Sequence, residues 1–304
     1  MNRNQIIAQL KGIFAPVVTP FNRRGDIDAG AFQHNLRRYA GIGLGGIVVA
    51  GSTGEAPYLA ERERLRLVEL ARQVVRPPEL LMVGTGLEST RETLRLSQEA
   101  IARGADALLV VTPNYYKSRM DSTALTAHYR RVADGVRRPV LIYSIPQFTG
   151  VHIDAAAIGS LSRHPNILGL KESSGDLAFV KQVLGKVSRR FHVLIGAVQI
   201  IFDALCAGAA GGVLGQSDYA PELCVGLYEA FVQGRPETAR QLQQRLMPLA
   251  LKINAPYGVA GVKAACDLAG YAGGPCRGPL ITLGAKGRKA VAAALKESRQ
   301  GLAF

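Results

Sequence analysis

Lys171 is the residue of this chain best placed to form a covalent bond with a substrate. It ends the apolar run 167–170, which has the composition of a strand buried on both faces. The stem of a lysine there lies in the interior, where desolvation disfavours the charged ammonium. A neutral amine can attack a ketone carbonyl and form an imine. A single lysine at a strand end more commonly extends to solvent, so the imine hypothesis depends on its neighbours.

Tyrosines supply candidate proton donors and acceptors for such chemistry. Tyr143 ends the apolar run that precedes the one closed by Lys171. A phenol there could shuttle protons during imine formation and carbon–carbon cleavage. The alternative is a tyrosine packed by its ring, with its hydroxyl bonded to backbone. Tyr115 and Tyr116 are a second source of phenols, although paired tyrosines are more often core or interface residues than catalysts.

A glycine-flanked loop offers a site for a carboxylate. Ser52 and Thr53 lie between two glycines directly after an apolar run. Two hydroxyls and several free backbone N–H groups in one loop suit an anion. A plain strand-to-helix turn would have the same composition, so the loop alone does not establish binding.

These residues stand at the ends of regularly spaced elements. Eight short apolar, β-rich runs recur, with amphipathic segments between them, as expected for strands buried on both faces of a parallel sheet. The runs are 12–19, 46–51, 80–85, 107–112, 139–144, 167–171, 191–196 and 212–215. A helix-to-strand junction with a glycine cap also repeats, at 40–43, 102–105 and 207–210.

The repeated unit predicts an α/β fold, a (β/α)8 TIM barrel over residues 1–220. A doubly wound open sheet is the alternative, disfavoured by the even spacing and by the lack of a G-x-G-x-x-G fingerprint. After residue 215 the pattern predicts helices at 221–233, 236–254, 258–269 and 285–299. We therefore expect residues 221–304 to form a C-terminal helical extension packed on the barrel, as one functional unit.

In such barrels the active site forms where the strands end, at their carboxyl ends. The chemically capable residues of this chain follow the runs at those ends, so we expect them to converge. They are Ser52, Thr53, Tyr115, Tyr143, Lys171 and Gly196.

Composition and charge exclude several other classes of protein. The formal net charge is +14, but the basic residues are dispersed along polar helix faces, so we expect no nucleic-acid partner. The four cysteines form no C-x-x-C pair and have no histidine cluster nearby, so we expect no metal and no cofactor. The N-terminus lacks a signal-peptide core and no long apolar run exists, so we expect a cytoplasmic protein with no membrane contact.

Three motifs in this order resemble one family of enzymes. They are GSTGE at 51–55, YSIPQFTG at 143–150 and GLKESS at 169–174. The chain, from residue 12 to about residue 280, is similar to the dihydrodipicolinate synthase and N-acetylneuraminate lyase family of class I aldolases. The first motif resembles the loop that binds the pyruvate carboxylate in that family. The second resembles its catalytic tyrosine motif, and the third resembles its Schiff-base lysine motif. Singly each is weak, but together they are highly specific.

The resemblance implies roles for individual residues. Lys171 would form the imine with a small 2-oxo acid, and Tyr143 would be the proton donor and acceptor. Thr53 would bind the pyruvate carboxylate and relay protons between Tyr143 and Tyr115. Tyr115 would reach into the site of a neighbouring subunit, and Leu214 would face the bound keto acid with its backbone carbonyl. The resemblance also implies a homotetramer, built as a dimer of dimers.

One position departs from the synthase pattern. The synthase subgroup usually has an arginine two residues after the proline, where it binds the carboxylate of the aldehyde substrate. Here that position is Phe148, which cannot form a bidentate pair with a carboxylate. Lys263 and Arg277 are candidate substitutes. Segments 143–146, 164–167 and 270–279 resemble instead the 4-hydroxy-2-oxoglutarate aldolase branch.

The leading hypothesis is therefore a class I aldolase that cleaves a 4-hydroxy-2-oxo acid such as 4-hydroxy-2-oxoglutarate. The alternative within this class is condensation of pyruvate with aspartate semialdehyde, as in 4-hydroxy-tetrahydrodipicolinate synthesis. From a different class, the chain could be a non-catalytic barrel that binds a keto acid. The presence of both Lys171 and Tyr143 argues against that third reading.

Overall fold

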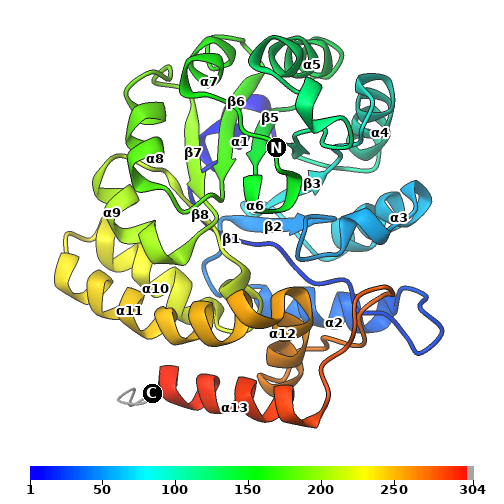
Figure 1. Cartoon of the computed structure of the whole chain (residues 1–304), viewed down its shortest axis with the longest axis vertical. Coiled ribbons are helices and arrows are strands. Elements are labelled where there is room, and N and C mark those ends of the chain that lie inside the picture. Colours follow the sequence, from blue (N-terminus) through cyan, green and yellow to red (C-terminus); the bar gives the residue numbers. More distant parts are fainter. Residues whose placement is uncertain (300–304) are drawn as a thin grey trace.

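Eight parallel strands close into a barrel in chain order, with β8 pairing back onto β1. Figure 1 shows the computed structural model, which describes residues 1–299. All eight expected strands form, which confirms the barrel prediction. They are β1 (Gly12–Ala15), β2 (Gly46–Val49), β3 (Leu80–Gly84), β4 (Ala107–Val111), β5 (Val140–Ser144), β6 (Ile167–Glu172), β7 (His192–Ile195) and β8 (Gly211–Val213).

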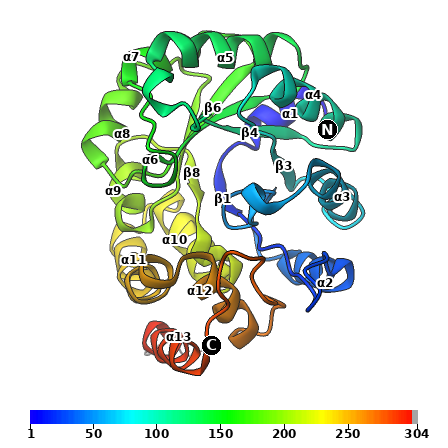
Figure 2. The same ribbon diagram turned by 45° about the vertical axis from the view of Figure 1, so that its right-hand side comes forward.

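Helices connect successive strands and surround the barrel (Figure 2). Several begin at an aspartate whose side chain accepts a hydrogen bond from the first helical turn, for example Asp28 before α2 and Asp121 before α5. The helices of this part are α1 (Arg3–Ala8), α2 (Ala29–Tyr39), α3 (Glu61–Arg72), α4 (Thr90–Ala102), α5 (Ser122–Asp134), α6 (Pro146–Thr149), α7 (Ala155–Leu161), α8 (Leu177–Leu184) and α9 (Ile201–Cys206). No helix within residues 1–299 is long and apolar enough to cross a membrane.

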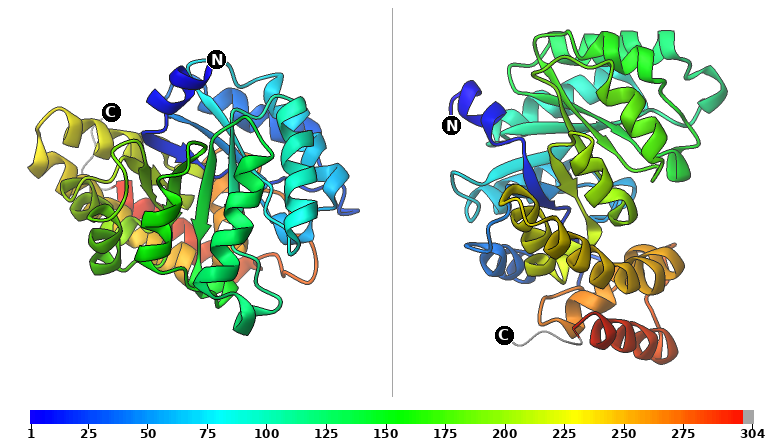
Figure 3. Two further views of the ribbon diagram at one scale, coloured as in Figure 1. Left: turned by 90° about the horizontal axis from the view of Figure 1, so that it is seen from above. Right: turned by 90° about the vertical axis from the view of Figure 1, so that its left-hand side faces the viewer.

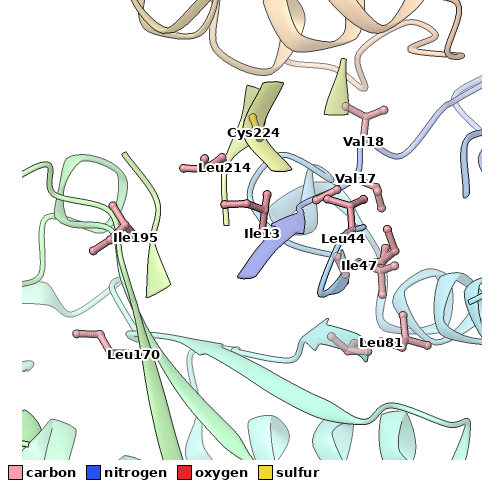
Figure 4. Packing of buried hydrophobic residues seen from close by; sticks show 14 of the residues in the cluster. Ile13, Val17, Val18, Leu44, Ile47, Leu81, Leu170, Ile195, Leu214 and Cys224 are labelled. Atoms are coloured by element: carbon pink, nitrogen blue, oxygen red, sulfur yellow. The ribbon is translucent and has the colours of Figure 1, made fainter. Parts of the chain in front are cut away.

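The core has two layers, which follow from strand alternation. One layer lies between barrel and helices, and Figure 4 shows side chains of it, including Ile13, Leu170 and Ile195. The other fills the barrel interior and includes Phe14 and Tyr143. Because successive strand residues point to opposite faces, the outward position of Leu170 directs the next side chain, Lys171, into the barrel.

The N-terminal helix closes the end of the barrel opposite the site. Ile6 of α1 and Leu10 are fully buried and belong to the interior cluster. They pack with Leu80, at the start of β3. The amino end of the barrel is thereby filled with apolar side chains, and only the carboxyl end is left for chemistry.

The C-terminal helices gather on one side of the barrel, coloured yellow to red in Figure 3. They are α10 (Pro221–Val232), α11 (Pro236–Leu249), α12 (Ala255–Leu268) and α13 (Ala285–Arg299). α10 follows β8 and contacts β1, and a π-helical segment (Ala250–Asn254) joins α11 to α12. The expected break near residue 258 is the kink at Gly258, whose φ of 51° favours glycine. Residues 300–304 of the expected extension lie outside the described residues.

Candidate active site

Lys171 and Tyr143 lie side by side on neighbouring strands. They are register partners in the β5–β6 pair, and Nζ of Lys171 is 4.1 Å from the centre of the Tyr143 ring. Each side chain is only 4% exposed. A buried amine next to a phenol is the arrangement that imine chemistry requires, with a nucleophile and a proton donor in one enclosed place.

The loop after β2 adds a hydroxyl to this pair. The Oγ of Ser52 lies 3.2 Å from the hydroxyl of Tyr143, within hydrogen-bond reach. Thr53, which the family resemblance assigned to this relay, is half-buried in the same loop. The hydroxyl that contacts Tyr143 in the described chain is therefore that of Ser52.

Strained backbone and a buried ion pair hold this loop in place. Ala50 and Glu55, one before and one near the end of the loop, have φ of 51° and 59°, which is uncommon outside glycine. The carboxylate of Glu55 is 1% exposed, accepts the Arg277 amide at 2.9 Å and pairs with the ammonium of Lys263. Lys263 of α12 and Arg277 of the segment after it thus hold the Ser52 loop in its shape.

The structure rules out Lys263 and Arg277 as free carboxylate binders, and corrects that suggestion. Lys263 is 1% exposed and engaged by Glu55 and by the Pro275 carbonyl. The guanidinium of Arg277 forms a two-point contact with Glu63, with both N–O distances at 2.7 Å. Each cation is therefore already neutralised by a carboxylate of its own chain.

Gly196 and Leu214 lie at the ends of β7 and β8. A Cβ at Gly196 would come within 1.9 Å of the Ser173 hydroxyl, so glycine is required for the close approach of this loop to the end of β6. Leu214 is fully buried, and its carbonyl accepts hydrogen bonds from the Ser217 amide (3.0 Å) and hydroxyl (2.5 Å). Both positions border the barrel end where Lys171 lies.

Tyr115 lies outside the core of its own chain. It is 76% exposed, and its ring stacks edge-on against Tyr116 at 5.0 Å between centroids. The carboxylate of Glu88 accepts the backbone N–H groups of Asn114 (2.9 Å) and Tyr115 (2.8 Å). The loop is therefore tethered at its base while the phenol projects to solvent.

A cavity of about 840 Å³ opens at this end of the barrel. Its lining includes Ser52 and Tyr143, and, farther out, Phe148 and Tyr257. Lys171 is not itself part of the lining, but Tyr143 is, and the Nζ of Lys171 lies over the Tyr143 ring. This volume is in the ordinary range for a small-molecule site.

A buried acid near Lys171 was not foreseen. Asp218 is fully buried after β8, and neither carboxylate oxygen has a hydrogen-bond partner among the described residues. Burial raises its pKa well above the ordinary value, more than the charge of Lys171 lowers it. No group of three or more His, Cys, Asp or Glu able to hold a metal lies within residues 1–299.

Comparison with known proteins identifies the family of this chain. The model of the dihydrodipicolinate synthetase family matches residues 9–298. An uncharacterised DapA-like lyase of Halobacterium salinarum is 37% identical over 290 residues, 95% of this chain and 94% of the relative. A 4-hydroxy-tetrahydrodipicolinate synthase of Methanopyrus kandleri is 34% identical over 275 residues, 90% of this chain and 91% of the relative.

A solved structure extends the likeness to the fold. YagE from Escherichia coli K12, a prophage protein of the dihydrodipicolinic acid synthase family in complex with pyruvate, is 27% identical with a TM-score of 0.89. The match covers 95% of this chain and 98% of that one. With the family model spanning nearly the whole chain, this protein belongs to the dihydrodipicolinate synthetase family and is a lyase of the pyruvate-dependent aldolase type.

Proposed function

We propose that this chain is a class I aldolase that holds a pyruvate-type 2-oxo acid as a Schiff base on Lys171. The observation that carries the proposal is the placement of the Lys171 amine over the Tyr143 ring, with the Tyr143 hydroxyl next to Ser52. The pyruvate in the related YagE structure supports the choice of 2-oxo acid. The reaction needs no metal and no cofactor, because the imine itself withdraws electrons.

In the proposed mechanism Tyr143 carries out the proton transfers, which its hydroxyl beside Ser52 and its ring under Lys171 support. The neutral amine of Lys171 attacks the C2 carbonyl, and a proton passes from the nitrogen to the carbonyl oxygen. The resulting hydroxyl leaves as water after receiving a second proton from Tyr143. The resulting iminium accepts the electron pair of the C3–C4 bond when that bond breaks. Tyr143, now a phenolate, removes the proton of the C4 hydroxyl, which becomes an aldehyde. Tyr143 then donates that proton to C3 of the enamine, and addition of water to the iminium releases pyruvate and free Lys171.

The loop after β2 is the proposed carboxylate site. The Ser52 hydroxyl lies next to that of Tyr143, and Thr53 follows in the same loop, so a C1 carboxylate bound there would present C2 to Lys171. Gly196 and Leu214 would complete the floor of the site at the ends of β7 and β8.

Cleavage of a 4-hydroxy-2-oxo acid is the favoured direction, and 4-hydroxy-2-oxoglutarate is the substrate that the sequence resemblance suggests. Condensation of pyruvate with aspartate semialdehyde is the second candidate, supported by relatives named 4-hydroxy-tetrahydrodipicolinate synthase. Phe148 argues against condensation. It lines the cavity and is 68% exposed at the position where the synthase subgroup has an arginine that binds the carboxylate of the aldehyde.

We also propose a cytoplasmic homotetramer in which Tyr115 serves a neighbouring subunit. Its phenol projects away from its own core on a loop held by Glu88. A phenol exposed in this way is available to a second copy of the chain.

The test is a pair of assays on one preparation. Pyruvate release is measured from a series of 4-hydroxy-2-oxo acids, and condensation is measured with pyruvate and aspartate semialdehyde. The proposal expects cleavage of at least one 4-hydroxy-2-oxo acid to exceed semialdehyde condensation in kcat/KM. Condensation that is tenfold faster than every cleavage reaction would replace the cleavage proposal with the synthase reading.

A further inference from the structure

The outer half of the cavity is apolar. Phe148, Tyr257 and Val259 belong to its lining, and Leu280 and Ile281 join them from the segment between α12 and α13. Ile281 is 85% exposed and Phe148 is 68% exposed, so large apolar side chains stand open around the entrance. Exposed apolar surface grouped at the mouth of a cavity is typical of a ligand site.

α6 is held so that Phe148 faces this space. The side-chain amide of Gln147 donates to the Ser173 carbonyl at 2.7 Å, which ties α6 to the end of β6. Gln147 and Thr149 belong to the same lining as Phe148. Phe148 therefore lines the same cavity as Tyr143, whose ring lies under the Lys171 amine.

No charged side chain in the described lining is free to bind a second carboxylate. Arg64 donates from both terminal nitrogens to backbone carbonyls, at 3.2 Å and 2.7 Å, and its Nε is sealed from solvent. Glu55 is paired with Lys263, and Glu88 accepts two backbone N–H groups. A carboxylate in the outer half would lose hydration without gaining a cation, and it would share the cavity with Glu88.

Lys117 is a cation that lies beside the lining. Its Nζ lies 3.9 Å from the position that a Cβ on Gly150 would occupy, and Gly150 follows the lining residue Thr149. Lys117 is exposed on the loop that carries Tyr115. It is the residue that could give a distal carboxylate a partner, so the test includes it.

We infer that the substrate carries an aromatic group on C4, so that cleavage yields pyruvate and an aromatic aldehyde. The inference rests on the proposed function and narrows it. The bond that breaks is C3–C4, its electron pair passes to the iminium on Lys171, and the C4 hydroxyl proton passes to Tyr143. An aryl group on C4 is buried against Phe148 and Tyr257, where aromatic side chains favour stacked or edge-on contacts.

The experiment compares two substrates that differ only in the group on C4. They are 4-hydroxy-2-oxo-4-phenylbutanoate and 4-hydroxy-2-oxoglutarate, and pyruvate release is followed for both. We expect kcat/KM to be at least tenfold higher for the phenyl substrate. A ratio below ten overturns the inference.

Variants locate the cause of the preference. Phe148→Arg should reduce the phenyl-to-carboxylate ratio at least tenfold. Val232→Arg adds the same charge to an exposed apolar position of α10 outside the lining and should leave the ratio unchanged. If Phe148→Arg does not fold, Ile281→Arg makes the same test at a more exposed position. A ratio that neither cavity variant changes overturns the inference.

Lys117→Ala tests the alternative cation. We expect no change in cleavage of 4-hydroxy-2-oxoglutarate. A tenfold loss would show that Lys117 binds the distal carboxylate of this substrate and would overturn the inference.

Borohydride trapping of pyruvate on the wild-type enzyme distinguishes failure of the proposed function from failure of the substrate inference. No adduct on Lys171 means that the proposed function fails, whereas an adduct with a ratio below ten means that only the choice of substrate fails.

Discussion

The Nζ of Lys171 lies 4.1 Å from the centre of the Tyr143 ring, because the two residues are register partners on β6 and β5. The contact uses the face of the ring, while the hydroxyl of Tyr143 is directed to Ser52, 3.2 Å away. In the proposed mechanism, packing and proton transfer therefore belong to different parts of one side chain, and a substitution can separate them.

Tyr143→Phe should keep the ring under Lys171 and remove only the hydroxyl. We expect turnover to fall by about 10²–10⁴-fold, the usual range for losing a general acid–base, with little change in stability. Steady-state pyruvate release measures this. Tyr228→Phe removes a phenol on α10, outside the cavity lining, and should retain turnover. Near-normal turnover in Tyr143→Phe would assign the proton transfers to another group.

Lys263→Met should destabilise the fold by about 3–5 kcal/mol, because it leaves the Glu55 carboxylate buried and unpaired. Urea unfolding measures the loss. Adding Glu55→Gln should recover much of it, since no buried charge then remains. Lys252→Met is the matched control, because its pair with Glu297 is exposed and worth about 0–1 kcal/mol. Equal losses in the two single variants would contradict the role assigned to the buried pair.

Acid should weaken the fold through His128. Burial lowers the pKa of this imidazole from 6.5 to about 4, although Glu88 acts to raise it. Below pH 6.5 the unfolded chain takes up a proton that the folded protein does not accept until about pH 4. Stability is therefore lost as pH falls through this window, by at most about 3 kcal/mol from this group.

The measurement for His128 is the unfolding free energy at pH 7 and pH 4.5, compared with His128→Asn. Asparagine cannot be protonated but can keep a hydrogen bond to Thr90, which lies 2.9 Å from Nδ1. The variant should lose less stability on acidification than the wild type. An equal loss in both proteins would assign the acid sensitivity to other groups.

Mixing two inactive variants tests whether Tyr115 acts across subunits. Lys171→Ala lacks the nucleophile and Tyr115→Phe lacks the phenol. In a hybrid dimer, one site combines the intact Lys171 of one subunit with the intact Tyr115 of the other. Random mixing should restore about a quarter of wild-type turnover, since half of the dimers are hybrids with one complete site. No recovery after subunit exchange would show that Tyr115 serves its own chain.

The sequence was sufficient to predict the barrel and the central pair of the site. Buried strands of a parallel sheet have local apolar patterns, and strand alternation after Leu170 already directs Lys171 inward. Residues that end neighbouring strands must meet at the same end of a barrel, so the closeness of Tyr143 and Lys171 follows from topology.

Other parts of the site could not be read from local pattern. The pairing of Glu55 with Lys263 joins residues that are far apart in the chain, so neither position shows it. The same is true of Arg277 and Glu63, which is why both cations were considered free. Asp218 has no motif around it, and its isolation from hydrogen-bond partners depends on side chains from several elements. The contact of Tyr143 with Ser52, next to Thr53, depends on the exact path of a strained loop.

Borohydride reduction in the presence of pyruvate tests the central claim most directly. The account predicts that one three-carbon unit is added to the protein and that peptide mass spectrometry places it on Lys171. Lys263 is also buried, and the masses of the two lysine-containing peptides distinguish an adduct on Lys263 from one on Lys171. An adduct on a different lysine, or no adduct at all, would contradict the Schiff-base mechanism.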